Sequence, residues 1–240
     1  MKTLIAANWK MHGDMSWADK PTEFAALTSD VTDVNYEVLF CAPDILLSPL
    51  YQTAAQHGYS TGGQDCHWEH SGAHTGETSA ALLKSAGATH VIIGHSERRA
   101  AGETDTQVKA KLTSALEAGL IPILCVGETR AEREGGQALS IVEAQLKAAL
   151  PAAIPQTPIV IAYEPVWAIG TGLTPSLEDI RDMHDHIRGL VGTNTPILYG
   201  GSVKPANAGD ILALYNVNGA LIGGASLDME SLAAIAKSAL

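Results

Sequence analysis

The chain has 240 residues, 46% hydrophobic and 17% charged, a composition typical of an ordered globular protein rather than a disordered one. Its 15 basic and 26 acidic side chains give a formal charge of −11 without a basic cluster, which argues against nucleic-acid and anionic-membrane binding. The cysteines at 41, 66 and 125 contain no CxxC motif, so we expect free thiols in a reducing compartment, by default the cytoplasm. The apolar run before Asn8 is too short for a signal peptide or a membrane span.

Short apolar runs recur along the chain and predict eight strands. In chain order they are 3–7, 37–42, 59–63, 89–94, 121–126, 158–163, 195–200 and 219–224. The third run, YSTGG, has the weakest strand character. Most of the others lack polar alternation, which is typical of parallel strands buried on both faces.

Amphipathic segments rich in Ala, Leu, Glu and Lys separate these runs and predict helices. Thr104, followed three residues later by Gln, has the spacing of a capping box, and Gly119 has the position of a helix-ending glycine. Thr174 followed by Pro175 predicts the start of a helix that ends near Leu190.

The alternation of strand and helix implies parallel pairing through right-handed crossovers. An open doubly wound sheet would use the same alternation. Eight similar units in a chain of this length favour closure into a single-domain (β/α)8 barrel of the α/β class, spanning 1–240 without a linker.

In such a barrel the chemistry lies at the carboxyl ends of the strands. The unusual residues gather there: Asn8, Lys10, Gln64, His95, Cys125, Glu128, Glu164 and the glycine-rich stretches 200–202 and 223–226. Each of these residues also has an ordinary structural interpretation. Lys10 could be a solvated surface charge, His95 could cap a turn, and Glu164 could be a carboxylate held in an ion pair. A carboxylate at the mouth of a packed strand is costly to desolvate, and convergence of all three predicts a site.

Glycine pairs after the last two predicted strands have a specific use. At 200–202 and 223–226 they expose backbone N–H groups beside helix starts, which is how barrels bind phosphate, although plain turn glycines are the alternative. The acidic surface does not forbid an anionic ligand, because salt screens distant charges over about 8–10 Å.

A cluster of potential metal ligands competes with this interpretation: Asp65, Cys66, His67, Glu69, His70 and His74. Their spacing matches no zinc pattern, so no metal is predicted. Cys125 as the nucleophile of a Cys/His pair is disfavoured, since a free cysteine is more often a small core residue.

Six motifs together identify a family. NWKM at 8–11, GHSERR at 94–99, CVGE at 125–128, AYEPVWAIGTG at 162–172, YGGSV at 199–203 and GGASL at 223–227 resemble triosephosphate isomerases, in order and across essentially the whole chain. The resemblance implies a TIM barrel and a cofactor-free isomerase of glycolysis and gluconeogenesis. It would interconvert dihydroxyacetone phosphate and D-glyceraldehyde 3-phosphate through an enediolate.

The resemblance also implies residue roles. Glu164 would be the base, His95 a neutral electrophile, as is well known for this family, and Lys10 with Asn8 would stabilise the enediolate. The remaining implied groups are phosphate-binding N–H groups at Gly170, Ser202, Gly223 and Gly224, and supporting side chains at Glu97 and Cys125.

The segment after Glu164 is implied to be a lid over the bound phosphate. It would run from Pro165 to Gly172, with hinges at 165–167 and 171–173, and exclude water when closed. Tyr199 and Ser202 would hold the closed lid.

A homodimer is implied as well, through a loop at 64–79 whose Thr75 would enter a pocket beside the partner's Lys10 and the partner's Asn8. The interface residues would include Gln64, Asp65, Cys66 and His74. Asp65 stands where the family usually has Asn, and His74 where Phe or Tyr is common. We therefore expect an altered, pH-dependent dimer affinity and an oxidation-sensitive thiol at Cys66.

Two other functions compete. A Schiff-base aldolase needs a lysine deep on a strand, often the sixth, and this strand ends in Glu164 instead. A non-catalytic barrel that binds phosphometabolites is the third hypothesis, disfavoured by the intact Lys10, His95 and Glu164.

Overall fold

The strands of the protein close into a parallel barrel in the order β1 to β8. The structure, a computed structural model, describes residues 2–32, 34–151, 158–169 and 174–239. The strands are β1 Thr3–Asn8, β2 Tyr36–Cys41, β3 Ser60–Gly63, β4 His90–Ile93, β5 Ile121–Val126, β6 Val160–Tyr163, β7 Ile197–Tyr199 and β8 Gly219–Ile222. β1 pairs with β2 from Thr3 opposite Tyr36, and with β8 from Leu4 opposite Gly219, which closes the sheet. Each predicted run overlaps a strand, and the predicted fold class is confirmed.

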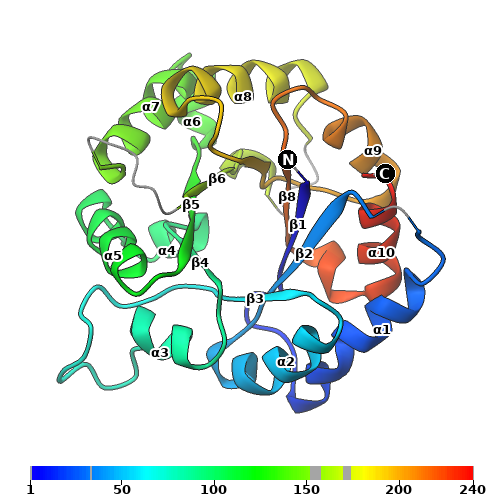
Figure 1. Cartoon of the computed structure of the whole chain (residues 1–240). Helices are drawn as coiled ribbons and strands as arrows, with labels where there is room; N and C mark the ends of the chain where they lie inside the picture. The colour runs from blue at the N-terminus through cyan, green and yellow to red at the C-terminus, as the bar shows by residue number, and fades with distance from the viewer. Residues whose placement is uncertain (1, 33, 152–157, 170–173, 240) are drawn as a thin grey trace.

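Helices form an outer ring around this barrel (Figure 1). They are α1 Lys20–Leu27, α2 Asp44–Gln56, α3 Ala80–Ser85, α4 Ser96–Ala100, α5 Asp105–Glu117, α6 Arg130–Glu134, α7 Ala138–Ala149, α8 Leu177–Val191, α9 Pro205–Leu212 and α10 Met229–Lys237. Three short 3-10 helices accompany them: η1 Met15–Asp19, η2 Val166–Ala168 and η3 Gly224–Leu227. Among the described residues, no helix combines the length and apolarity needed to cross a bilayer.

Helix ends follow local side-chain chemistry. The capping box at Thr104 is confirmed, and Gly119 has the positive φ of +72° expected after a helix. The predicted start of α8 was wrong by two residues. Ser176, rather than Thr174, caps this helix, because its hydroxyl accepts from Asp179 N–H while the Asp179 carboxylate accepts from Ser176 N–H.

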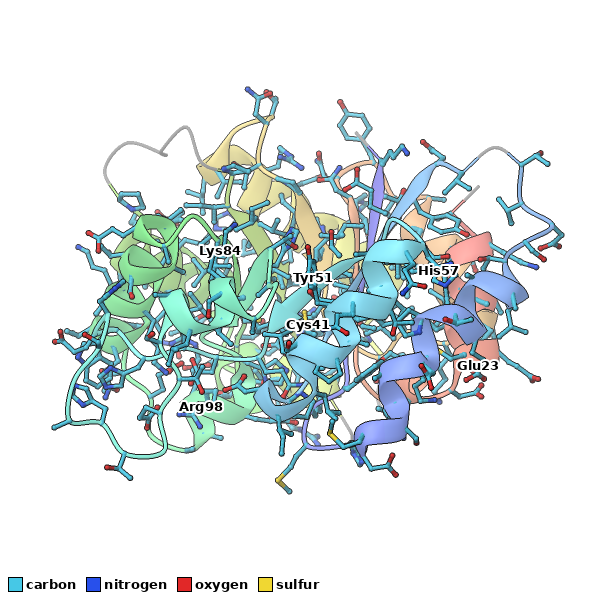
Figure 2. The ribbon with its side chains drawn as sticks, turned by 60° about the horizontal axis from the view of Figure 1, so that its bottom comes forward. Glu23, Cys41, Tyr51, His57, Lys84 and Arg98 are labelled. Atoms are coloured by element: carbon cyan, nitrogen blue, oxygen red, sulfur yellow. The ribbon has the colours of Figure 1, made fainter. Side chains whose placement is uncertain are left out.

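The strands are buried on both faces, as predicted. Alternate residues such as Leu39, Ile123 and Leu198 fill the barrel interior. Their neighbours along the strands, such as Phe40 and Leu124, pack with the apolar faces of the helices. Cys41 lies inside, behind α2 (Figure 2).

The barrel has two distinct ends. Arg98, just after β4, lies toward the end where the strands finish, and Lys84 lies toward the other (Figure 2). The Lys84 ammonium donates to Gly119 O, just before β5, at 2.9 Å. Residues that follow strands therefore share one mouth.

Candidate active site

Lys10 is held at the mouth in an unusual backbone conformation. Its φ of 53° is the one positive value for a non-glycine residue in the described ranges. Lys10 N–H donates to Asn8 Oδ1 at 3.0 Å, and the Gln64 amide donates to Lys10 O at 2.9 Å and to Cys41 O at 3.1 Å. Strain of this kind persists where the surroundings fix the backbone, and it is enriched at functional sites.

The Lys10 ammonium reaches across the mouth to α4. Its Nζ lies 2.5 Å from Glu97 Oε1, and the Glu97 side chain is 57% exposed. An exposed ion pair contributes little stability, so an anionic ligand can compete for the ammonium at small cost.

His95 lies where β4 passes into α4, and both of its ring nitrogens have partners. Nδ1 accepts from the N–H of Glu97 at 3.2 Å, which requires a lone pair on that atom. Nε2 lies 3.0 Å from Glu164 Oε1, so it carries the hydrogen. This geometry describes a neutral imidazole that presents an N–H donor to the mouth.

Glu164, directly after β6, is a buried carboxylate, only 2% exposed. Its Oε2 accepts from Ser96 N–H at 2.9 Å, and its Oε1 accepts from Ser96 Oγ at 3.3 Å in addition to His95. These donors offset the cost of burying the charge. Ser96 was not singled out in the sequence, because a serine at a helix start is ordinary.

Two glycines allow the backbone to approach Glu164. A Cβ on Gly127 would lie 1.7 Å from Glu164 O, and a Cβ on Gly200 would lie 2.9 Å from Glu164 Cγ. Any side chain at 127 must therefore displace the base. Sequence reasoning missed Gly127, whose role depends on packing between β5 and β6.

Cys125, on β5, is fully buried. Burial, followed by the charge of Glu164, raises the pKa of its thiol well above the usual range. The nucleophile is the thiolate, so this environment disfavours the Cys/His alternative and fits a supporting role.

A cavity of about 520 Å³ brings most of the predicted residues together. Its lining includes Asn8, Lys10, His95, Glu164, Ser202, Gly223 and Gly224. A Cβ on Gly223 would lie only 3.3 Å from Lys10 Cε, so the glycine-rich turn and the ammonium are neighbours. Gly170 lies outside the described residues.

The chain was compared with known proteins. The family model described as triosephosphate isomerase matches residues 3–239. The chain belongs to the triosephosphate isomerase family.

Relatives of that name agree in length as well as sequence. The enzyme from Jannaschia sp. (strain CCS1) is 49% identical over 245 residues, covering 98% of this chain and 96% of the relative. The one from Ruegeria pomeroyi is 51% identical over 235 residues, with 94% and 92% covered. A crystal structure of triosephosphate isomerase from Bartonella henselae matches with a TM-score of 0.89 and 40% identity, covering 99% of each chain.

In this member of the triosephosphate isomerase family, the described part of the predicted lid ends at Ile169 and contacts a buried carboxylate. Glu128 is fully buried and accepts from Tyr163 OH at 3.1 Å, Trp167 Nε1 at 2.8 Å and Arg133 at 3.3 Å. Glu128 therefore binds Trp167, in the first part of the predicted lid segment. Its function there was not predicted from the sequence. The second hinge, 171–173, lies outside the described residues.

Tyr199 and Ser202 lie under the same segment. Ser202 Oγ donates to Ala168 O at 3.2 Å. Tyr199 is fully buried, and burial raises the pKa of its phenol. A Cβ on Gly201 would lie 2.2 Å from the Tyr199 hydroxyl oxygen, so this hydroxyl packs against the turn that carries Ser202.

The predicted interface residues have different surroundings. Asp65 binds Lys111 at 2.7 Å and Arg98 at 2.9 Å. His74 is exposed and its ring lies 4.1 Å from that of His67, centroid to centroid. Thr75 is exposed.

The potential metal ligands of this loop are dispersed among these contacts. Within the described ranges, no three His, Cys, Asp or Glu side chains are grouped so as to hold a metal ion. Cys66 is buried, and burial raises the pKa of its thiol to about 12. A thiol that is neither exposed nor ionised at neutral pH argues against the expected oxidation sensitivity.

Proposed function

We propose that Glu164 and His95 perform the proton transfers in the interconversion of dihydroxyacetone phosphate and D-glyceraldehyde 3-phosphate, the reaction of this family. The observation that carries this assignment is the 3.0 Å contact between Glu164 Oε1 and His95 Nε2 at a cavity that Lys10 also lines. A base and a hydrogen-bond donor thus face the same space, which is what proton removal beside a carbonyl needs.

In the forward direction, Glu164 removes a proton from C1 of dihydroxyacetone phosphate. The electron pair of the broken C–H bond forms a C1–C2 double bond, and the carbonyl electrons move to the C2 oxygen. His95 N–H and the Lys10 ammonium, with Asn8, stabilise that oxygen, and His95 carries a proton between the two oxygens. Return of a proton from Glu164 to C2 completes the aldose. These steps require no cofactor.

Substrate must first release Glu164 from its resting partners. The carboxylate accepts from both the N–H and the hydroxyl of Ser96, so a bound triose has to draw it toward the reacting carbons. Closure of the predicted lid, Pro165 to Gly172, over the substrate would exclude water at the same time and strengthen the base.

The phosphate would bind backbone N–H groups of Ser202, Gly223 and Gly224, together with Gly170. Support comes from their position along the cavity beside Lys10. Backbone donors at a glycine-rich turn bind a phosphate without a large positive charge.

The test is interconversion of the two triose phosphates in excess chelator, by parent and Glu164→Gln side by side, with binding of a triose-phosphate analogue measured on both. Loss of about 10³-fold or more in kcat with binding retained is expected, because the substitution removes the base and leaves the phosphate donors. Equal turnover by the variant would refute the role of Glu164. Binding without turnover by the parent would favour the non-catalytic barrel.

We also propose a homodimer in which the loop at 64–79 docks on a second copy. A second cavity, about 410 Å³, opens beside Lys10 and is lined by Asn8, Met11, Gln64, Asp65, Glu97 and Arg98. Met11 is 95% exposed and Thr75 is exposed at the loop tip, so an apolar rim and a protruding loop are both available. Sedimentation should give twice the monomer mass, and the mass of a single chain at micromolar concentration would contradict it.

A cytoplasmic location is proposed on the basis of the cysteines. All three thiols are free and buried, a state that a reducing compartment preserves. Fractionation of the cells that make the protein would test this location.

A further inference from the structure

The 520 Å³ cavity extends past the predicted phosphate donors. Beyond Ser202 its lining continues to Val203, Lys204 and Pro205, and it reaches Ser231 on α10. Lys204 has no part in the assignments above. It immediately precedes α9, at the same mouth as the reacting groups.

Local bonds fix the backbone of Lys204. Its N–H donates to Asn207 Oδ1 at 2.7 Å, and the Asn207 amide in turn donates to Ser202 O at 3.1 Å. Pro205 begins the helix directly after it. The lysine is therefore attached, through one asparagine, to the turn that carries a predicted phosphate donor.

Two lysines line this cavity, and their charges are differently placed. Lys10 faces Glu97 at 2.5 Å. Lys204 has an exposed side chain with no carboxylate within 4.0 Å in the part of the chain that the structure describes. The ammonium of Lys204 is thus the less compensated of the two.

The charge of the whole molecule makes this local cation important. A triose phosphate carries nearly two negative charges at neutral pH, and the chain carries a formal charge of −11. A cation at the rim of a cleft lowers the local potential energy of an anion and raises its association rate, most strongly at low ionic strength. A lysine far from the cleft would change only the net charge of the molecule.

We propose that Lys204 is a specificity-determining residue that draws the phosphate of the substrate into the cavity and favours phosphorylated over neutral trioses. It acts on encounter and binding, whereas Glu164 acts on the reacting carbons and His95 on the two oxygens. This role rests on the proposed function of the cavity.

Lys204→Gln tests the proposal, with Lys2→Gln as the matched control. Lys2 is also exposed and its loss changes the net charge equally, but it precedes β1 at the opposite end of the barrel. At about 0.01 M ionic strength, where the Debye length is about 30 Å, we expect Lys204→Gln to lower kcat/KM for glyceraldehyde 3-phosphate about two- to fivefold through KM. The loss of kcat/KM in Lys204→Gln should disappear near 1 M salt. Lys204→Arg should have the kcat/KM of the parent, and so should Lys2→Gln.

Two further measurements separate this role from a structural one. Inorganic phosphate should inhibit Lys204→Gln less strongly than the parent at low salt. The loss of kcat/KM should be confined to phosphorylated substrate, so unphosphorylated glyceraldehyde should not show it.

Equal kinetics of Lys204→Gln and Lys2→Gln at every ionic strength would overturn the proposal, as would an equal loss with unphosphorylated glyceraldehyde. A parent without isomerase activity would instead refute the proposed function, so the two failures are distinguishable.

Discussion

Histidines occupy two regions of this protein in different ways. At the barrel mouth, both nitrogens of His95 contact polar atoms, Glu97 N–H and Glu164 Oε1. In the loop at 64–79, the ring of His67 lies 4.3 Å from the Trp68 ring and 4.1 Å from the His74 ring, and its Nδ1 accepts from Glu69 N–H at 3.0 Å. His95 is held by polar contacts to its two ring nitrogens, and His67 is held mainly by contacts of its ring faces with other rings.

The difference teaches that local density of reactive residues is a poor guide to chemistry. The loop contains more histidines per residue than any other part of the chain, yet they stack or face solvent. At the barrel mouth, the turn after β4 fixes His95 against a buried carboxylate. Contact with the buried Glu164 carboxylate in the cavity distinguishes His95 from the loop histidines.

Among the variants that test this contrast, the largest effect should come from His95→Gln. The substitution keeps a hydrogen-bond donor but removes the ring that moves a proton between oxygens, so kcat should fall about 10²–10³-fold. Steady-state kinetics in both directions would measure the loss. His70→Gln, in the loop, is the control and should keep the parent kcat. Equal losses in the two variants would abolish the contrast between the regions.

Gly127→Ala tests whether placement of the base matters. The new Cβ would lie 1.7 Å from Glu164 O, so the backbone at the base must move. A shift of about 1 Å at a reacting group costs about 10²-fold in rate. Gly189→Ala is the control, because a Cβ there meets no atom within 4 Å. A variant at 127 with the parent kcat and normal folding would contradict this role.

His184 should make stability depend on pH. It lies fully buried on α8, its Nδ1 is 3.0 Å from Asn216 O, and burial lowers its pKa to about 4. The pKa of His184 in the folded protein lies below the unfolded value of about 6.5. The free energy of unfolding is therefore unaffected by its protonation above pH 6.5, and it decreases as pH falls toward 4. The loss should approach roughly 3 kcal/mol. Urea unfolding at pH 7, 6 and 5 would show it, and a constant midpoint would count against it.

The smallest effect is expected for His74→Phe. An exposed ring in tilted contact with another ring is replaced by a ring of similar shape, so the free energy of unfolding should change by about 0.5 kcal/mol or less. Chemical denaturation measures this change, with His74→Ala as the comparison that removes the ring contact. A loss of several kcal/mol from His74→Phe would mean that a ring nitrogen of His74 has a structural partner.

The barrel and most of its mouth could be predicted because they depend on local patterns. The apolar runs predicted the eight strands, and the polar residues that follow these runs included Lys10, His95 and Glu164. Ser96 and Gly127 could not be found this way. Their importance depends on contacts with Glu164 from parts of the chain that are distant in sequence, which no spacing in the sequence encodes.

The loop was harder for the same reason. The ring contact of His67 and His74 depends on a turn at Gly72, where a Cβ would lie 3.2 Å from the His74 ring. Ser176 was missed as a cap because Thr174 and Pro175 made an equally good local signal. The reciprocal capping box of Ser176 and Asp179 places the start of the helix two residues later.

The most direct test of the central claim is the fate of the transferred hydrogen. Dihydroxyacetone phosphate is converted in D₂O, and the glyceraldehyde 3-phosphate formed is trapped and examined for deuterium at C2. The account predicts deuterium there with the parent, because Glu164 holds the abstracted proton where solvent can exchange it, and almost no product with Glu164→Gln. Turnover without any solvent deuterium in the product, or undiminished incorporation by Glu164→Gln, would contradict proton transfer through this carboxylate.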